Sequence, residues 1–155
     1  MKIAFVCHGN ICRSPMAEFV FKDMIKKQGL LKDLTVLSFA TSDEEIWCGR
    51  GNPIHRGTIG IFKKHNIPYD EGKRAVQLTK SDYEKFDLFI GMDFANVRNM
   101  HRIFGSDPEN KIKLLLEYAN EQGEVADPWY TGNFDVTYSD IVRGCVGLLR
   151  SINEI

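Results

Sequence analysis

Residues 3–15 read Ile3-Ala4-Phe5-Val6-Cys7-His8-Gly9-Asn10-Ile11-Cys12-Arg13-Ser14-Pro15, and this run sets the first strand, loop and helix. Its first four residues are apolar without a break, which is typical of a strand buried in a parallel sheet. Ser14 and Pro15 then predict a helix start, because Ser is favoured at the N-cap and Pro is tolerated at the first helical position. An apolar helix face follows at the expected spacing, formed by Ala17, Val20, Phe21 and Met24.

The loop between this strand and helix is suited to hold an anion against a thiol. Gly9 and Asn10 tolerate the left-handed backbone angles that let successive N–H groups point into one concavity, beside the positive end of the helix dipole. Arg13 offers a planar fork of donors that grips two phosphate oxygens at once. These donors favour the nucleophilic thiolate form of Cys7, and the Ser14 hydroxyl can also hydrogen-bond the sulfur. A Cys-x5-Arg pattern also occurs by chance, but its position between a strand and a capped helix favours a phosphate site.

A second candidate group lies far down the chain, in Asp127-Pro128-Trp129-Tyr130. Pro128 favours an extended backbone at Asp127 and is expected to keep the segment out of any helix. A carboxylic acid aimed from such a loop can protonate the alkoxide or phenoxide that leaves when a thiolate takes a phosphoryl group. Because Asp-Pro alone is an ordinary turn sequence, Asp127 becomes the candidate acid only in combination with the loop from Cys7 to Arg13.

Together these motifs resemble the low-molecular-weight protein tyrosine phosphatase family. The strongest matching segments are Val6–Pro15 and Ala126–Tyr130. The resemblance extends over nearly the whole chain through Ala40-Thr41-Ser42, Val76-Gln77-Leu78-Thr79-Lys80-Ser81-Asp82-Tyr83, Met92-Asp93 and Asn96. It implies a hydrolysis in two steps through a phosphocysteine, without a metal or cofactor. By position, Cys7 would be the nucleophile, Arg13 would bind phosphate, and Asp127 would act first as acid and then as base.

The resemblance also implies supporting roles and exposes departures from the family. Asn10 and Ser14 match residues that shape the loop and stabilise the thiolate, with Ser42 as their expected partner. Many members carry a His where this chain has Gly72-Lys73-Arg74, so a network built on that imidazole is in doubt. His8 stands where Leu, Met or Thr is common, and its side chain either lines the pocket or points outward into solvent.

Composition fits one domain spanning residues 1–155, since a chain of 155 residues buries well over half of its unfolded surface. Its 20 Lys and Arg residues nearly balance 21 Asp and Glu residues, for a formal charge of −1. Without a dense basic run, neither nucleic acid nor a membrane surface is expected as a partner. The start does not resemble a leader and no apolar run has membrane-spanning length, so a cytoplasmic location is expected. Four cysteines do not make a disulfide framework here, and a thiolate nucleophile needs reducing surroundings.

The remaining pattern alternates strands with helices and predicts an α/β fold. Strands are expected at Leu34–Ala40, Asp87–Met92 and Ile112–Leu116, and helices at Pro53–Asn66, Thr79–Phe86, Ala95–Phe104 and Phe134–Ile152. Gly144 and Gly147 weaken propensity in the last helix and indicate close packing. The alternation of strands with helices implies parallel strand pairing with right-handed crossovers. The family resemblance further implies a three-layer, Rossmann-like fold of the phosphotyrosine phosphatase I type: a four-stranded parallel sheet, order 2-1-3-4, flanked by helices. Cys7 then lies at the carboxyl edge, where such sheets bind ligands.

The expected substrate pocket combines the loop with aromatic side chains. Its predicted lining from the loop comprises His8, Gly9, Asn10, Ile11, Cys12 and Ser14, which would also bind inorganic phosphate or sulfate. Trp129 and Tyr130 would form one wall and Trp47 the other, so that an aromatic ring stacks between them. An ordinary surface or packing position for Trp47 is equally compatible with the sequence. Trp129 stands where relatives often have Tyr, which keeps the aromatic character.

The other cysteines invite different interpretations. Cys48 and Cys145 are interpreted as spacer and core residues, since free Cys behaves as a small hydrophobe. A zinc site built on Cys7, His8 and Cys12 lacks a second ligand pair at usable spacing, so no metal is expected. Cys12 either packs beneath the loop or traps oxidised Cys7 as a reversible disulfide.

The sequence therefore predicts a phosphomonoester hydrolase that acts on tyrosine-phosphorylated proteins and on small aryl phosphates. Ile11 favours phosphotyrosine over phosphoarginine, because the family's protein-arginine phosphatase branch typically has Thr there, whose hydroxyl suits a phosphoguanidinium. Two other activities share the loop. A thioredoxin-coupled arsenate reductase needs further cysteines downstream, and no Cys lies between Cys48 and Cys145. A phosphocarrier of a sugar transport system needs neither Arg13 nor Asp127.

Overall fold

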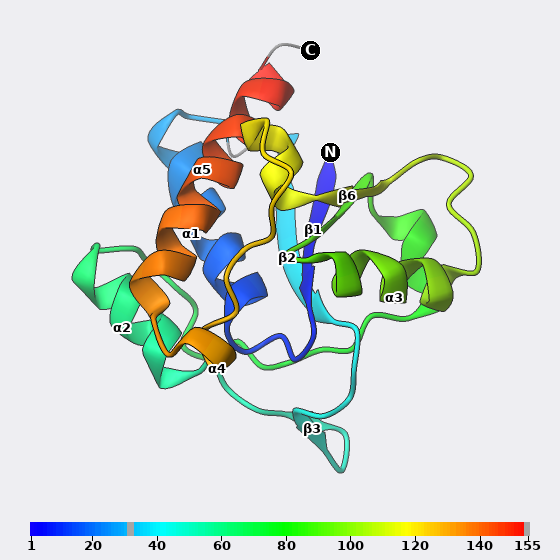
Figure 1. Ribbon diagram of the computed structural model, residues 1–155, viewed down its shortest axis with the longest axis horizontal. Coiled ribbons are helices and arrows are strands. Elements are labelled where there is room, and N and C mark those ends of the chain that lie inside the picture. Colours follow the sequence, from blue (N-terminus) through cyan, green and yellow to red (C-terminus); the bar gives the residue numbers. More distant parts are fainter. Residues whose placement is uncertain (31–32, 154–155) are drawn as a thin grey trace.

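The computed structural model describes residues 1–30 and 33–153. At its centre is a four-stranded sheet in the order β2-β1-β5-β6, in which all neighbouring strands run parallel (Figure 1). The strands are β1 (Lys2–Cys7), β2 (Thr35–Ala40), β5 (Leu88–Gly91) and β6 (Ile112–Leu114). Numbered among themselves these strands follow the order 2-1-3-4, so the predicted fold and strand order are confirmed.

Helices cover both faces of the sheet and complete three layers (Figure 1). One side carries α1 (Arg13–Lys27), α2 (Arg56–Lys64) and α5 (Phe134–Asn153), and the other carries α3 (Phe94–Phe104) and the 3-10 helix η2 (Lys80–Lys85). Side chains of β1 alternate between the two cores: Ile3 and Phe5 pack on the α1 and α5 side, whereas Ala4 and Val6 pack on the α3 side. None of the helices described is long and apolar enough to cross a membrane.

The last helix, α5, packs closely on α1 and on the 3-10 helix η3 (Leu115–Ala119). A Cβ atom at Gly144 would collide with the Leu115 side chain, and one at Gly147 would collide with the Tyr118 carbonyl. The close packing predicted at both glycines is therefore confirmed.

Two predicted helix starts differ from the structure. Helix α1 begins at Arg13 with Cys12 at its N-cap, so the predicted cap at Ser14 is wrong. The reason is that the Ser14 hydroxyl lies within the first turn and faces the Cys7 sulfur instead of capping backbone amides. The helix predicted from Pro53 begins only at Arg56, because His55 is its N-cap and accepts a hydrogen bond from the Gly57 N–H at 3.0 Å.

Other local elements also depart from prediction. Residues 80–85 form the 3-10 helix η2 and not an α-helix, after a capping box between Thr79 and Asp82. The fourth strand ends at Leu114, earlier than predicted, because the chain turns directly into η3. The antiparallel hairpin of β3 (Ile46–Trp47) and β4 (Arg50–Gly51) is not predicted; its turn uses the positive φ angles of Cys48 and Gly49.

Candidate active site

The loop after β1 wraps around the sulfur of Cys7. Cys7 is 4% exposed at the end of the strand, and Asn10 adopts the left-handed conformation that its residue type tolerates, with φ of 59°. The backbone N–H groups of Asn10 and Ser14 donate to Cys7 Sγ at 3.3 and 3.4 Å. The loop and the first turn of α1 therefore form a cradle of donors around the thiol.

A side-chain relay gives the Cys7 sulfur a third donor. Ser14 Oγ lies 3.0 Å from Sγ and accepts a hydrogen bond from Asn10 Nδ2 at 2.8 Å. Because Asn10 occupies a lone pair of this oxygen, the hydroxyl hydrogen can point at the sulfur. The predicted contact between Ser14 and the sulfur is thus confirmed, and three hydrogen-bonding groups surround one sulfur.

The Asn10 amide is itself held from several directions. Its Oδ1 accepts hydrogen bonds from Val76 N at 3.0 Å and from Lys73 Nζ at 2.9 Å, and its Nδ2 also donates to Ser38 Oγ at 3.0 Å. Ser38 in turn donates to the buried carboxylate of Glu18 at 2.5 Å. The network fixes which way the amide points, and with it the direction of the relay to the sulfur.

Lys73 belongs to the segment in which a His was expected from the family resemblance, and it supplies a donor, so a network is present without an imidazole. Its Nζ also donates to the backbone carbonyl of Ser38 at 3.2 Å. Burial lowers the pKa of the Lys73 ammonium, while the charges of Glu18 and Cys7 oppose that shift. The lysine thus brings a positive charge to the network as well as a hydrogen bond.

Ser38, and not the predicted Ser42, is the serine that hydrogen-bonds the Asn10 side chain. Ser42 donates instead to the backbone carbonyl of His8 at 2.9 Å. The difference follows from the sheet register: Ser38 lies on β2 opposite Phe5 of β1, next to the loop, whereas Ser42 lies beyond the end of β2.

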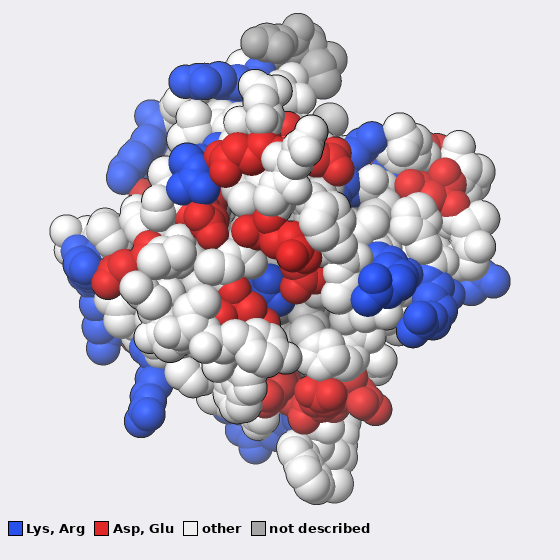
Figure 2. Space-filling view, in the orientation of Figure 1, with Lys and Arg blue, Asp and Glu red and all other residues white. Residues whose placement is uncertain are grey.

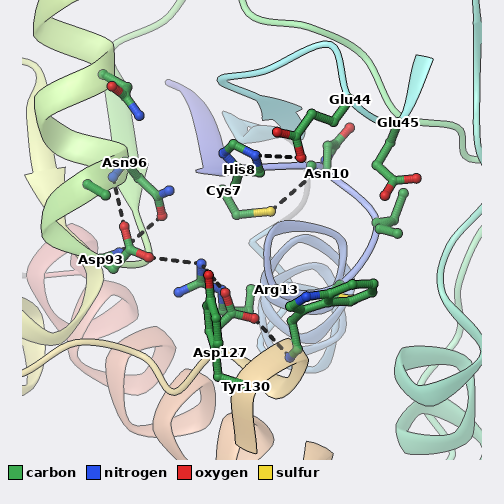
Figure 3. Close-up of a pocket in the computed structure, with 16 residues that line it drawn as sticks. Cys7, His8, Asn10, Arg13, Glu44, Glu45, Asp93, Asn96, Asp127 and Tyr130 are labelled. Carbon is green, nitrogen blue, oxygen red and sulfur yellow. Dashed lines mark hydrogen bonds and ion pairs between the residues drawn. The ribbon is translucent and has the colours of Figure 1, made fainter. Parts of the chain in front are cut away.

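Arg13 lies in the pocket with its guanidinium held by carboxylates (Figure 3). Its Nη1 donates to the Val125 carbonyl at 3.1 Å, and its Nη2 donates to Asp93 Oδ2 at 2.9 Å and to Asp127 Oδ2 at 3.3 Å. Burial lowers the pKa of this guanidinium, but the charges of Cys7, Asp93 and Asp127 outweigh it, so the pKa is raised. A permanent positive charge therefore lies at the phosphate loop.

Asp127 is the N-cap of a one-turn helix, α4 (Pro128–Thr131). Its Oδ1 accepts a hydrogen bond from Trp129 N at 3.0 Å, which leaves Oδ2 for Arg13. The expectation that Pro128 excludes a helix is wrong, because Pro is compatible with the first helical position, where no N–H is required. The cap aims the carboxylate toward Arg13.

These groups open into a pocket of about 480 Å³ (Figure 3). The predicted residues Cys7 to Arg13 line it, together with Asp127, Trp129 and Tyr130. Ser14, also predicted to line the pocket, is fully buried behind the loop and contacts the sulfur from there. A volume of about 480 Å³ lies within the usual range of small-molecule binding pockets.

Two predicted pocket residues lie differently from the rest. Trp47 is on the β3–β4 hairpin, 73% exposed, and the structure does not place it among the residues lining this pocket. His8 does line the pocket, and its Nε2 lies 2.9 Å from Glu44 Oε2 at the exposed rim.

All four cysteines are free. Burial, followed by the charges of Cys7 and Asp127, raises the pKa of Cys12 to about 12; Arg13 opposes this shift, and Glu45 adds a smaller contribution to it. Cys48 is exposed in its hairpin turn, and Cys145 is fully buried in α5, as expected of spacer and core residues. Residues 1–30 and 33–153 contain no group of three or more His, Cys, Asp or Glu side chains placed to hold a metal ion.

Comparison with known proteins shows the family to which this chain belongs. The family model for low molecular weight phosphotyrosine protein phosphatases matches residues 2–155. The chain belongs to this family. Its members are hydrolases, and the loop, the arginine and the aspartate described above are the groups on which such chemistry would depend.

Relatives of this phosphatase match it along nearly their whole length. The low molecular weight protein-tyrosine-phosphatase YfkJ of Bacillus subtilis is 38% identical over 156 residues, covering 99% of this chain and 97% of that protein. The crystal structure of YfkJ has a TM-score of 0.92 and covers 99% of this chain and 95% of that chain. SP-PTP, the low molecular weight protein tyrosine phosphatase of Streptococcus pyogenes, is 43% identical, with a TM-score of 0.84 and coverage of 97% and 91%.

The fold is also shared with a protein named for another substrate. The structure of DARP, the Drosophila arginine phosphatase, is 26% identical, with a TM-score of 0.84 and coverage of 98% of both chains. The fold by itself therefore does not separate a tyrosine from an arginine phosphatase, and the substrate has to be argued from the side chains of the pocket.

This phosphatase has pocket residues to which sequence reasoning gave no role. Asp93 binds Arg13 and is fixed by a capping box: its Oδ1 accepts from Asn96 N at 2.7 Å, and Asn96 Oδ1 accepts from Asp93 N at 3.1 Å. Sequence reasoning could have found Asp93, because it directly follows a buried strand at the edge of the sheet where ligands bind. Glu44 and Glu45 also line the pocket, but they lie on a loop whose path depends on tertiary packing.

Proposed function

We propose that this phosphatase hydrolyses phosphotyrosine in proteins, and small aryl phosphates in solution, through a phosphocysteine on Cys7. The observation that carries the proposal is the convergence of the Asn10 and Ser14 N–H groups and the Ser14 hydroxyl on one sulfur, with Arg13 and Asp127 in the same pocket. Backbone, hydroxyl and guanidinium donors suit a thiolate and a phosphate dianion bound against each other.

In the first step, the Cys7 thiolate attacks phosphorus, an S–P bond forms and the P–O bond to the tyrosine breaks. The phenolate oxygen takes a proton from the Asp127 carboxyl group, which therefore has to be protonated when the substrate is bound. In the second step, Asp127 accepts a proton from water, the water oxygen attacks phosphorus, and the S–P bond breaks. Inorganic phosphate leaves and the thiolate is restored.

Arg13 and the loop amides bind the transferred group throughout. A planar guanidinium can donate to two equatorial phosphate oxygens, where charge accumulates in the transition state. The contact between Arg13 Nη2 and Asp127 at 3.3 Å would then give way to the phosphate, which frees the carboxyl group for proton transfer. Asp93, at 2.9 Å, holds the guanidinium in orientation.

The choice of phosphotyrosine rests on the upper part of the pocket. Ile11 presents a branched apolar side chain without a hydroxyl, and Trp129 and Tyr130 provide aromatic surface on which a phenyl ring stacks. A phosphoguanidinium would find no hydroxyl partner at position 11. A cytoplasmic location is part of the proposal, because a thiolate nucleophile needs reducing surroundings.

The test is a substrate panel of phosphotyrosine, phosphoserine and phosphoarginine versions of one peptide, with released phosphate as the readout. We expect kcat/KM to be highest for phosphotyrosine, and mass spectrometry after acid quench to find one phosphoryl group on Cys7. Release of free phosphate also separates this activity from a phosphocarrier. A preference for phosphoarginine would overturn the substrate while leaving the chemistry of Cys7, Arg13 and Asp127 in place.

A further inference from the structure

The mouth of the pocket has an acidic wall that the hydrolysis described above does not use. Figure 3 shows Glu44 and Glu45 across the pocket from Asp127 and Tyr130, with the Cys7 sulfur between the two sides. In Figure 2, acidic side chains gather across the middle of this face, and most of the basic ones lie further out. A dianionic phosphate that enters the pocket would therefore pass carboxylates that repel it.

Glu45 is held in place at this rim. A Cβ atom at Gly9 would lie 3.0 Å from Glu45 Cγ, so the absence of a side chain at Gly9 lets the stem of Glu45 pack on the phosphate loop. Its Oε2 accepts a hydrogen bond from Asn52 Nδ2 at 2.7 Å. The carboxylate is thereby fixed beside the loop and does not swing freely in solvent.

Among the described carboxylates that line the pocket, Glu45 has an uncharged hydrogen-bond partner, Asn52, whereas the others lie beside Arg13 or His8. Arg13 is within 3.3 Å of both Asp93 and Asp127, and His8 lies beside Glu44. Among the described residues that line the pocket, the basic side chains are Arg13 and His8. The Asn52 amide carries no charge, so the negative charge of Glu45 is available to a cation of the substrate.

The opposite wall is aromatic. Trp129 and Tyr130 line the pocket and are 75% and 84% exposed. Exposed indole and phenol rings bind ammonium and guanidinium groups over their faces, with the largest effect for Trp. An aromatic wall facing a fixed carboxylate is therefore suited to a cationic side chain placed between them.

We propose that the mouth selects phosphotyrosine flanked by lysine or arginine, whose cation binds between the Glu45 carboxylate and the part of the Trp129 and Tyr130 surface that the phosphotyrosine ring leaves uncovered. This inference rests on the proposed tyrosine phosphatase activity and names the class of protein substrate. The same wall disfavours phosphotyrosine flanked by acidic residues, through like-charge repulsion. Selection thus acts both by attraction and by exclusion.

The experiment uses three phosphotyrosyl peptides that differ only in the two residues flanking phosphotyrosine, both Lys, both Ala or both Glu. We expect kcat/KM to fall in the order Lys, Ala, Glu, and the spread to narrow when salt is raised above about 0.1 M, where screening acts within about 10 Å. Equal values for the three peptides would overturn the proposal.

The variant Glu45→Gln tests the residue itself, since glutamine can keep the Asn52 hydrogen bond through its carbonyl oxygen. We expect the kcat/KM ratio of the Lys to the Ala peptide to fall by about two- to fivefold, the scale of one exposed ion pair. Glu84→Gln, an exposed residue on η2, is the matched control for net charge and should keep the wild-type ratio. An unchanged ratio in Glu45→Gln, or an equal fall in both variants, would remove Glu45 from substrate selection. Failure of the underlying activity would look different, because no phosphotyrosyl peptide would then be turned over.

Discussion

The phosphate loop and the mouth of the pocket differ in how their side chains are held. In the loop, Asn10, Arg13 and Ser14 are at most 3% exposed, and each makes several hydrogen bonds. At the mouth, Trp129 and Tyr130 are mostly in solvent. Buried, hydrogen-bonded groups fix one geometry, whereas exposed groups are free to contact the parts of a substrate that lie outside the loop. The loop therefore sets the chemistry for every substrate, and the mouth sets which substrates are preferred.

The largest effect should come from Cys7→Ser. The serine hydroxyl is too weak a nucleophile without a base, so turnover should be lost, whereas phosphate binding should persist because it depends on loop amides and Arg13. Steady-state kinetics and phosphate titration measure the two properties. Appreciable turnover by this variant would falsify the phosphocysteine mechanism.

Asp127→Asn should follow, with a loss of about a hundredfold or more for phosphotyrosine, the scale of positioned acid catalysis. The loss should be smaller for p-nitrophenyl phosphate, because its leaving group needs less protonation. Comparing kcat/KM for the two substrates separates acid catalysis from support of the loop. Equal losses on both substrates would point to support alone.

Ile11→Thr tests the upper wall of the pocket. We expect the preference for phosphotyrosine over phosphoarginine to narrow or reverse by about 1 to 3 kcal/mol, the scale on which one pocket contact discriminates. The measurement is the ratio of kcat/KM values on matched peptides. Ile11→Val, which adds no hydroxyl, is the control and should keep the wild-type preference.

Lys73→Met should have the smallest effect of these, about fivefold in kcat/KM, because it removes one hydrogen bond from the network behind Asn10. Burial lowers the pKa of Lys73, so its ammonium loses the proton at a lower pH than an exposed lysine. Activity supported by that charge is present below the lowered pKa and declines as pH rises through it. The decline of wild-type activity at alkaline pH should therefore be smaller in Lys73→Met. A purely structural role of Lys73 would leave the shape of the pH profile unchanged.

Much of the fold follows from local pattern. The apolar run of β1 and the alternation of strands with helices were sufficient to predict an α/β fold with a parallel sheet, whereas the strand order followed from the family resemblance. Two local predictions failed, one because a side chain has another partner and one because proline is compatible with a helix start. Ser14 faces a sulfur instead of capping α1, and Pro128 starts a short helix at its first position.

The sequence by itself determined the residues of the loop, the candidate acid and their order along the chain, because these depend on neighbours in sequence and on residue chemistry. Only the tertiary structure decided that Ser38, Lys73 and Glu18 orient Asn10, that Asp93 binds Arg13, and that Glu45 lies against Gly9. These contacts join segments far apart in the chain. Their geometry depends on strand register and on packing between layers, which no local spacing specifies.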